Sequence, residues 1–391
     1  MPTILVIFGI SGDLSKRYLL PSLEKIVRAK MLPKNFKIVG VTRQKHPDLY
    51  VMDLTDKKDY EKLNDYLSEI EKKFKKPAQR LFYLVVPPNA CKNIITLIGQ
   101  SSLNKHKNNK ILLEKPFGTN LKSAIELIKH TDKYFKAKDV YRIDHYLAKD
   151  EIKQIILERN KKSFKAAWNN KFIEKIEILA SEKIGIEGRV HFYEQTGALR
   201  DFVQSHLLEL LALVLMKLPK DKKENVPSLR YKALKDLDIV CDVTKYECVK
   251  RGQYEGYRQE AGNPKSMTET FVFIKLSSSD KRWQGVPITL VTGKNLKEKF
   301  TKVKIKHQNG LIEFDFKDKE NVLGAYEQVL LAAINGDRNF FTSSAEVLES
   351  WRILEEVQNS WKNSKDDLII YKKGSTIEEV SKNNTCPVVN F

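Results

Sequence analysis

TILVIFGISGDLSKR, residues 3–17, is the stretch that decides how the first part of this chain folds. Its first six residues form a continuous apolar, largely β-branched run, which is typical of a strand buried on both faces of a parallel sheet. Gly9 and Gly12 follow, and a helical segment begins after them. Glycines at this point permit a tight turn and let backbone N–H groups approach a pyrophosphate at the helix N-terminus. The spacing is GxxGDL instead of GxGxxG, so a plain structural turn stays open beside the favoured interpretation, nucleotide binding.

Strands and helices alternate through the rest of the first part. Further strands are expected at 37–42, 81–86, 110–113 and 140–143, with helices at 58–74, 91–100 and 121–135. This alternation implies right-handed βαβ units and a parallel sheet. Ligands of such sheets bind at the carboxyl ends of the strands. Those ends carry Gly9–Asp13, Arg43, Pro87 and Lys115.

After about residue 150 the pattern changes. Helices are expected at 147–159, 199–216, 325–335 and 345–361, and strands at 172–181, 268–276, 288–291, 302–307 and 311–316. A run of strands without helices between them predicts an antiparallel sheet. We therefore expect an α/β dinucleotide-binding (Rossmann-like) domain over residues 1–146. A second α+β domain with a large, mainly antiparallel sheet is expected over residues 147–391.

The composition is that of a soluble globular protein, with 41% hydrophobic and 30% charged residues among 391. The net charge of +19 is compatible with nucleic acid or a membrane surface as partner. Lysine is scattered through nearly every segment, however, so a solvated surface is favoured and neither partner is expected. The apolar run 207–216 carries Glu209 and is about half a membrane span, which predicts a buried helix. The N-terminus has no basic leader, so no signal peptide is expected.

The four cysteines are too few and too irregularly spaced for a disulfide framework. Cys241 and Cys248 are seven residues apart, which matches no common zinc spacing, so no metal site is predicted. A reducing, cytoplasmic location is the natural inference.

The end of the second expected strand bears on the cofactor. Folds specific for NAD typically place an acidic residue there to hold the ribose 2′-hydroxyl. Here the sequence is VTRQK, residues 41–45, and Arg43 offers two donors to a 2′-phosphate. NADP is therefore favoured, with NAD as a second choice that Gln44 would tolerate. A solvated arginine is the alternative.

The decapeptide YRIDHYLAKD, residues 141–150, concentrates several chemical groups in one place. His145, Tyr146 and Lys149 would form an anion clamp, and Asp144 beside them could orient a catalytic base. The set suggests a site for a phosphorylated substrate.

Several motifs together resemble one family, glucose-6-phosphate dehydrogenase. The matching stretches follow one another along most of the chain: GISGDLSKRYLLPSL (9–23), LFYLVVPP (81–88), EKPFG (114–118), RIDHYLAKD (142–150), EGR (187–189), GALRDFVQSHLLELL (197–211), RWQGVPITLVTGKNL (282–296) and NGDRNFFTSSAEVLESWRI (335–353). The resemblance implies oxidation of glucose 6-phosphate to 6-phosphogluconolactone, the first oxidative step of the pentose phosphate pathway. Hydride would pass to NADP.

The resemblance also assigns roles. His206 is similar to the family's general base, since a histidine near neutral pKa can take a hydroxyl proton. Asp201 would point roughly 140° away from it on an α-helix. The resemblance therefore names Asp144 as the partner of His206. The implied substrate-binding residues are Lys115, His145, Tyr146, Lys149, Glu182, Asp201, Lys294 and Lys299. The implied cofactor-binding residues are Gly9, Ser11, Gly12, Asp13, Leu14, Arg43, Tyr83, Pro87, Glu114 and Lys115.

Some residues depart from the family pattern. Ala148 replaces a glycine, Asp150 a glutamate, and Phe316 stands where a substrate-binding glutamine is often found. Residues 43–53 and 302–316 are shorter than their family counterparts, and no second, structural NADP site is expected. The family implies a homodimer or tetramer, although the trimmed region includes its dimer-forming sheet.

Two other functions stay open. Sugar or polyol dehydrogenases of the glucose–fructose/inositol oxidoreductase type share the architecture and the EKP signal, but generally lack the phosphate clamp. A non-catalytic basic binding protein on the same fold is supported by charge alone.

Overall fold

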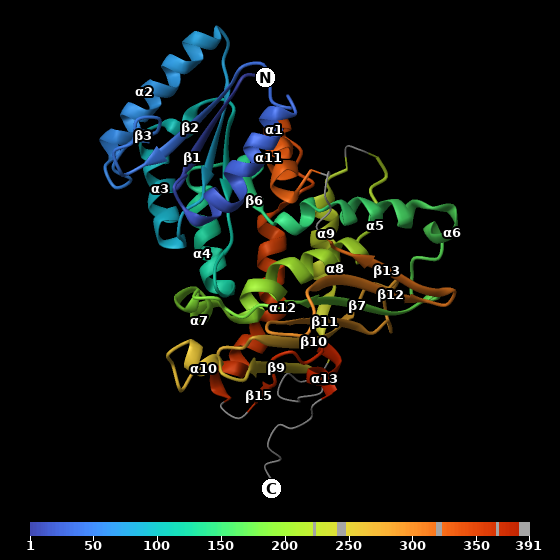
Figure 1. Cartoon of the computed structure of the whole chain (residues 1–391). Helices are drawn as coiled ribbons and strands as arrows, with labels where there is room; N and C mark the ends of the chain where they lie inside the picture. The colour runs from blue at the N-terminus through green and yellow to red at the C-terminus, as the bar shows by residue number, and fades with distance from the viewer. Residues whose placement is uncertain (222–223, 241–247, 318–322, 365–366, 383–391) are drawn as a thin grey trace. The chain divides into compact units, whose positions relative to one another are not determined.

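The structure is a computed structural model of the chain and describes residues 1–221, 224–240, 248–317, 323–364 and 367–382 (Figure 1). Two compact units make it up. The first contains residues 1–118, 122–148 and 320–344, and the second contains 119–121, 149–319 and 345–391. The expected boundary after residue 146 lies two residues from this division. The sequence-based division is wrong for 320–344, which we assigned to the second domain and which belongs to the first unit.

A seven-stranded sheet forms the centre of the first unit, and β1 (Thr3–Phe8) lies inside it. All six residues of β1 are buried, as the continuous apolar run predicts. The strand order is β14-β6-β5-β4-β1-β2-β3. The other strands are β2 (Phe36–Thr42), β3 (Tyr50–Val51), β4 (Gln79–Leu84), β5 (Asn109–Leu113), β6 (Val140–Ile143) and β14 (Phe341–Thr342). Only β14 pairs antiparallel, so the predicted parallel sheet is confirmed.

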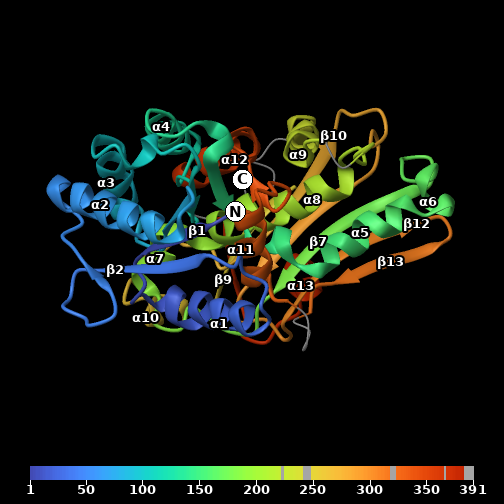
Figure 2. The ribbon, with the colours of Figure 1, turned by 90° about the horizontal axis from the view of Figure 1, so that it is seen from above.

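Helices cover both faces of this sheet (Figure 2). On one face, α1 (Leu20–Arg28) and α11 (Ala325–Asn335) pack against alternate residues of the central strands, such as Leu5 and Leu81. Apolar residues of α11, including Val329 and Leu330, complete that core, which is why residues 320–344 return to the first unit. On the other face, the ring of Phe8 stacks on Tyr60 at 6.1 Å. The helices that follow β3, β4 and β5 are α2 (Lys57–Phe74), α3 (Pro88–Gln100) and α4 (Leu121–Asp132).

The second unit is built on an eight-stranded, mainly antiparallel sheet, as predicted. Seven strands follow the order β13-β12-β7-β11-β10-β9-β15, and β8 pairs with β10. Only the pairs β7·β11 and β9·β15 are parallel. The strands are β7 (Ile173–Ser181), β8 (Leu237–Ile239), β9 (Val249–Tyr254), β10 (Phe271–Ser278), β11 (Ile288–Gly293), β12 (Phe300–His307), β13 (Gly310–Asp315) and β15 (Leu368–Tyr371). The sequence missed β8, β9 and β15, which are short or rich in polar residues.

Buried ion pairs join the helices of the second unit. Arg230 lies 2.5 Å from Glu346 and 3.3 Å from Glu209, and its side chain is fully buried. These residues come from α9 (Val226–Lys235), α12 (Ser344–Asn363) and α8 (Leu208–Leu215) respectively. A buried arginine needs such partners, since an unpaired buried charge is strongly destabilising. The remaining helices here are α5 (Asp150–Asn160), α6 (Lys162–Lys165), α7 (Val190–Ala198), η5 (Leu199–Leu207), α10 (Tyr257–Glu260) and α13 (Ile377–Lys382).

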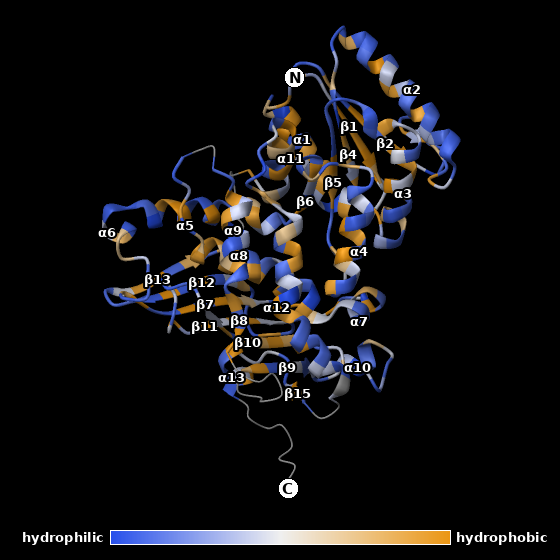
Figure 3. Ribbon diagram, turned by 180° about the vertical axis from the view of Figure 1, so that it is seen from behind, coloured by the Kyte–Doolittle hydropathy of each residue, from blue (hydrophilic) through white to orange (hydrophobic). Residues whose placement is uncertain are grey.

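The most apolar run of the chain forms the buried helix that was expected. Every residue of α8 is buried. Figure 3 shows apolar colour gathered on the central strands of the sheets, while long helices such as α2 alternate between apolar and polar colour. No helix in the described part of the chain is both long and apolar enough to cross a membrane. The cysteines depart in part from expectation: Cys248 is disulfide-bonded, whereas Cys91 is a free thiol whose pKa burial raises to about 12.

The turn after β1 gives a stability prediction. Gly9 has φ +85°, and a Cβ built there would lie 2.1 Å from the Val85 carbonyl oxygen. Gly336, in the same unit, has φ +75° but only a lysine Nζ at 3.6 Å. Gly336→Ala should therefore cost about 1–2 kcal/mol from backbone strain alone. Gly9→Ala should cost a further 1–3 kcal/mol, roughly, because the contact is with rigid backbone.

Urea unfolding followed by circular dichroism would measure both variants. Equal losses at the two positions would show that the Val85 carbonyl does not constrain the turn.

Candidate active site

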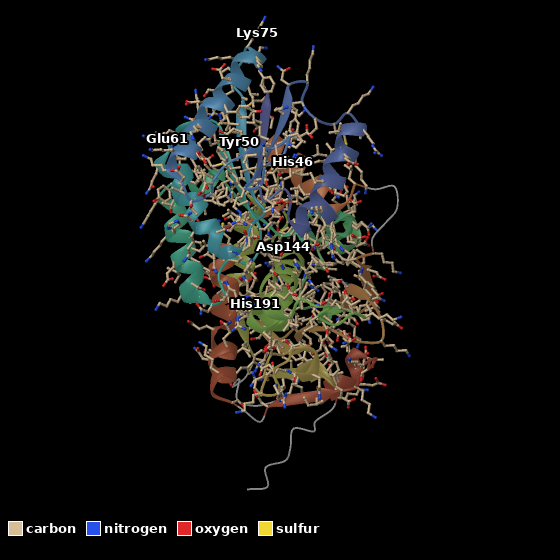
Figure 4. The ribbon with its side chains drawn as sticks, turned by 60° about the vertical axis from the view of Figure 1, so that its left-hand side comes forward. His46, Tyr50, Glu61, Lys75, Asp144 and His191 are labelled. Atoms are coloured by element: carbon tan, nitrogen blue, oxygen red, sulfur yellow. The ribbon has the colours of Figure 1, made fainter. Side chains whose placement is uncertain are left out.

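Five segments with candidate residues leave the first sheet at one edge. The last residues of β1, β2, β5 and β6 are followed directly by Gly9, Arg43, Glu114 and Asp144, in that order. Pro87 comes three residues after the end of β4. Parallel neighbours send their carboxyl ends to the same edge. Figure 4 labels Asp144 in this region, with His46 in the connection after β2 and Tyr50 at the start of β3.

The glycine turn is closed by its own hydrogen bonds. The Gly9 carbonyl accepts from the Gly12 N–H at 3.0 Å and from the Ser15 hydroxyl at 2.9 Å. Ser11 and Asp13 stay exposed, and Asp13 pairs with Arg17 at 2.8 Å. The turn leads into η1 (Ser15–Leu19), a π-helical segment continuous with α1. This strand–turn–helix arrangement fits a dinucleotide pyrophosphate at the helix N-terminus.

Arg43 is exposed at the end of β2, and the structure adds an acidic neighbour that sequence reasoning missed. The positive charge of Arg43 contributes to lowering the pKa of Asp53, although the main cause is hydrogen bonding from Thr55. The Asp53 carboxylate accepts from the Thr55 N–H at 2.8 Å and from its hydroxyl at 2.7 Å. The only sequence signal was the shortness of 43–53, which brings Asp53 back toward the strand end.

Glu114 and Tyr83 form a hydrogen-bonded pair on neighbouring strands. The Tyr83 hydroxyl donates to Glu114 Oε1 at 2.5 Å. The two side chains can meet because the register places Leu84, which follows Tyr83, beside Leu113, which precedes Glu114. Withdrawal from water raises the pKa of Glu114 to about 7, and the charge of Asp144 adds to this, while Tyr83 and Lys115 oppose it. The Glu114 carboxyl therefore titrates close to neutral pH.

Asp144 is held by the turn that it begins. It is buried, and its Oδ1 accepts from the Tyr146 N–H at 3.0 Å, which starts η4 (His145–Ala148). The His145 ring stacks on Tyr326 with centroids 5.9 Å apart. Tyr326 comes from α11 and also stacks on Tyr18 at 5.7 Å. No motif pointed to Tyr326, since only tertiary packing returns α11 to this sheet.

In the second unit, His206 lies on a π-helix, and this corrects a prediction. We expected Asp201 to point roughly 140° away from His206, which assumes an α-helix. Residues Leu199–Leu207 are π-helical, and backbone hydrogen bonds in a π-helix join residues five apart. Asp201 and His206 are therefore on the same side of η5. His206 is buried, and Phe202 meets its ring edge-on at 5.1 Å.

Glu269 fixes the start of this π-helix. Its Oε1 accepts from the Leu199 N–H at 2.9 Å, and its backbone carbonyl accepts from the Ala198 N–H at 2.9 Å. A Cβ on Gly197, which has φ +62°, would lie 2.3 Å from Glu269 Oε1. The glycine in the TGALRDF segment is thus required by a carboxylate that sequence reasoning did not identify.

Glu182 and Lys294 lie side by side at the ends of two parallel strands. The register pairs Ser181 with Gly293, so the next residues are neighbours, and Lys294 Nζ lies 2.5 Å from Glu182 Oε2. The buried ammonium of Lys294 also sits 5.2 Å from the centre of the Tyr193 ring. Burial, with the charges of Asp201 and Glu182 adding, raises the pKa of Tyr193 well above its usual value. Glu182, Asp201 and Lys294 thus surround one tyrosine.

The predicted site residues therefore form two groups. The first unit holds the cofactor candidates with Asp144, His145 and Tyr146, and the second holds Lys149, Glu182, Asp201, Lys294, Lys299 and His206. Lys299 is exposed, and Phe316, which replaces the usual glutamine, is buried.

The architecture, a parallel sheet with a glycine turn after β1 and a second, mainly antiparallel domain, is typical of dinucleotide-binding oxidoreductases. Comparison with known proteins narrows this class. The model of the glucose-6-phosphate dehydrogenase NAD binding domain matches residues 6–51 and 47–154. The model of the C-terminal domain of the same enzyme matches residues 156–313 and 311–384. The chain belongs to the glucose-6-phosphate dehydrogenase family.

Individual relatives agree. The chain is 29% identical to glucose-6-phosphate 1-dehydrogenase of Chlamydia muridarum, with 96% of this chain and 93% of the relative covered. A solved glucose-6-phosphate dehydrogenase in complex with glucose-6-phosphate superimposes with a TM-score of 0.86 at 26% identity, covering 96% and 95% of the two chains. The enzyme from Mycobacterium avium gives a TM-score of 0.79, also at 26% identity, covering 96% and 94%.

The comparisons also locate the shortening. The Chlamydia alignment extends over 481 residues, although this chain has 391. Each family model matches the chain in two parts, and the two parts meet at residues 47–51 in one model and at residues 311–313 in the other. Both interruptions fall in the two regions that the sequence indicated as abbreviated, 43–53 and 302–316.

The Glu114 carboxyl gives a pH prediction. Its folded pKa, about 7, lies above the ordinary 4.5, so between these values the folded state binds more protons than the unfolded state. The free energy of unfolding should therefore fall as pH rises through this window, and the loss is complete above pH 7. The glutamine in Glu114→Gln is uncharged at every pH, so this variant does not lose unfolding free energy in that window. Relative to wild type, it should gain roughly 3 kcal/mol between pH 4 and 8, at about 1.4 kcal/mol per pH unit.

Urea unfolding at several pH values would measure this gain. Glu61→Gln is the control, since Glu61 is an exposed carboxylate on α2 (Figure 4). The prediction is contradicted if the difference in unfolding free energy between Glu114→Gln and wild type changes with pH no more than it does for Glu61→Gln.

Proposed function

We propose that this protein oxidises glucose 6-phosphate at C1 to 6-phosphogluconolactone and uses NADP as hydride acceptor. The observation that carries the proposal is the match of both family domains to almost the whole chain. The retained residues support it, because a base, an anion clamp and a dinucleotide turn all stand at the positions of the family motifs.

In the proposed reaction, the C1 hydroxyl loses its proton to the imidazole of His206. The C1–H bond breaks and its electron pair leaves as hydride, while the C1–O bond becomes a carbonyl. The bound nicotinamide supplies the acceptor for that hydride. Asp144 stabilises the imidazolium that forms, in the manner of the aspartate in a hydrolase triad. An uncharged imidazole is the form that accepts a proton.

The substrate's two ends require different groups. His145, Tyr146 and Lys149 bind the phosphate, and the stacking of His145 on Tyr326 holds the ring in one orientation. Glu182, Asp201, Lys294, Lys299 and Lys115 bind sugar hydroxyls or the phosphate. The Glu182–Lys294 pair keeps a carboxylate and an ammonium together, so one can accept and the other donate to neighbouring hydroxyls.

On the cofactor side, Gly9, Ser11, Gly12, Asp13 and Leu14 form the pyrophosphate turn. Tyr83, Pro87, Glu114 and Lys115 line the path toward the nicotinamide. NADP is preferred because the guanidinium of Arg43 is exposed at the strand end. The nearby Asp53 accepts the Thr55 N–H and hydroxyl through Oδ1 alone, so its Oδ2 could accept a ribose 2′-hydroxyl of NAD. NAD is the second choice.

The protein would act in the cytoplasm as a homodimer or tetramer, without nucleic acid or membrane as partner. Another sugar dehydrogenase function is the alternative. An aldose-aldose oxidoreductase from Caulobacter crescentus superimposes on the chain with a TM-score of 0.53 at 10% identity. That likeness concerns the fold alone.

The activity can be tested by the absorbance of the reduced nicotinamide when the protein is mixed with glucose 6-phosphate and NADP. Turnover should require the phosphorylated sugar, and His206→Asn should lower kcat by about a hundredfold or more while substrate binding is mostly kept. His191→Asn is the matched control, since His191 is exposed on α7 of the same unit (Figure 4).

Failure to reduce NADP or NAD with glucose 6-phosphate would refute the main proposal. Equal turnover of unphosphorylated glucose would favour the alternative dehydrogenase.

Cofactor choice gives a second test. Arg43→Ala should raise the KM for NADP by about tenfold or more and leave the KM for NAD nearly unchanged, because only NADP carries the 2′-phosphate. Arg28→Ala, an exposed arginine on α1, controls for the general loss of positive charge. If Arg43→Ala raises the KM for NADP and the KM for NAD equally, Arg43 does not bind the 2′-phosphate.

A further inference from the structure

A basic cavity lies in the second unit, built from segments that carry none of the proposed catalytic or binding residues. Its volume is about 750 Å³. It is lined by the end of α5, α6 and the segment leading to β7, the residues after α8, and the turn between β10 and β11. We name it the α6–β7 cavity.

Positive charge dominates the lining. The cationic residues there are Arg159, Lys165, Lys171, Lys217, Lys281 and Arg282, and no carboxylate is among the lining residues. Arg282 is balanced by Asp280, which it meets at 2.6 Å. The four lysines have no ion pair among the described residues, and all four are exposed. Four like charges around one concavity repel each other, and an anion placed there would relieve that repulsion.

One wall of the cavity is the C-terminal end of α8, and it is unusually well capped. Arg159 donates to the carbonyls of Leu213 and Met216 through its two terminal nitrogens. The indole N–H groups of Trp168 and Trp283 donate to Val214 and Leu215, each at 2.9 Å. The last carbonyls of a helix are normally left to water or a cap. Here rigid side chains hold them, so the wall is preorganised.

Arg159 links this wall to the cavity. Its side chain is almost completely buried, and its guanidinium lies 5.5 Å from the centre of the Trp168 ring. Its Nε has no hydrogen-bond partner in the described part of the chain.

We propose that the α6–β7 cavity binds a chain of linked phosphates, either as the tail of a nucleotide or as free inorganic polyphosphate. The volume exceeds that of one phosphate group. The four lysines are exposed and match several negative charges in a row, although Asp280 also interacts electrostatically with Lys217. The six cationic side chains of the lining favour an anion over an uncharged sugar. Phe172, 37% exposed in the lining, offers an aromatic surface to a nucleotide base.

The test is isothermal titration of the full chain with two probes, inorganic triphosphate and ATP, without added metal ions. At least one probe should bind at a ratio of one per chain, more weakly as salt rises. The triple variant Lys171→Ala/Lys217→Ala/Lys281→Ala should bind about tenfold more weakly. The matched control is Lys232→Ala/Lys265→Ala/Lys372→Ala, which removes three exposed lysines of the same unit that do not line the cavity.

The outcomes are distinct. Tighter binding of ATP than of triphosphate identifies a nucleotide as ligand, and equal binding identifies the phosphate chain alone. The proposal is overturned if neither probe binds, or if the cavity variant leaves binding unchanged, which would place the probe at the pyrophosphate turn. It is also overturned if both triple variants weaken binding equally, which would indicate bulk charge. Thermal unfolding of both variants should match wild type, because all six lysines are exposed.

Discussion

The parallel pairing of β1 with both β2 and β4 is the constraint on which the first unit depends. A strand buried on both faces and hydrogen-bonded on both edges has no freedom of register. Its parallel neighbours must therefore end at the same edge as Gly9. That single requirement assembles the glycine turn, Arg43, the Tyr83–Glu114 pair and Asp144 from segments up to 135 residues apart.

In the second unit, the corresponding constraint is the fixed start of the helix that carries His206. Glu269 occupies the space beside Gly197 and accepts the Leu199 N–H, so the chain enters η5 in one way. The π-helical winding then brings Asp201 and His206 to one side of η5. The helix continues as α8, in which every residue is buried. Basic residues of the α6–β7 cavity cap the C-terminal end of α8. The helical segment 199–215 thus has the proposed base near its middle and the proposed polyphosphate site at its end.

Much of the fold was predictable because its strongest elements are locally encoded. The runs at Thr3–Phe8 and Val140–Ile143 are strands with the expected bounds, and Ala325–Asn335 is the expected helix. The predictions were weaker where local signals are weak. Val249–Tyr254 contains Lys, Arg, Gly and Gln, yet it is a strand because β10 and β15 pair with it. For the site, Glu114 was expected but its proximity to Tyr83 was not, because a cross-strand pair depends on register. Tyr326, Tyr193 and Glu269 carry no motif and were missed.

The sequence by itself determined the class of each unit, the residues of the family motifs and the places where the chain is shortened. These follow from local hydrophobic periodicity and from residue identities that need no partner to be recognised. Only the tertiary structure decided that residues 320–344 return to the first unit, that Asp201 and His206 share one side of a π-helix, and that Lys294 pairs with Glu182. Each of these depends on packing between segments far apart in the chain. Local sequence cannot specify it, because the free energy comes from burial and pairing that exist only once the chain has folded.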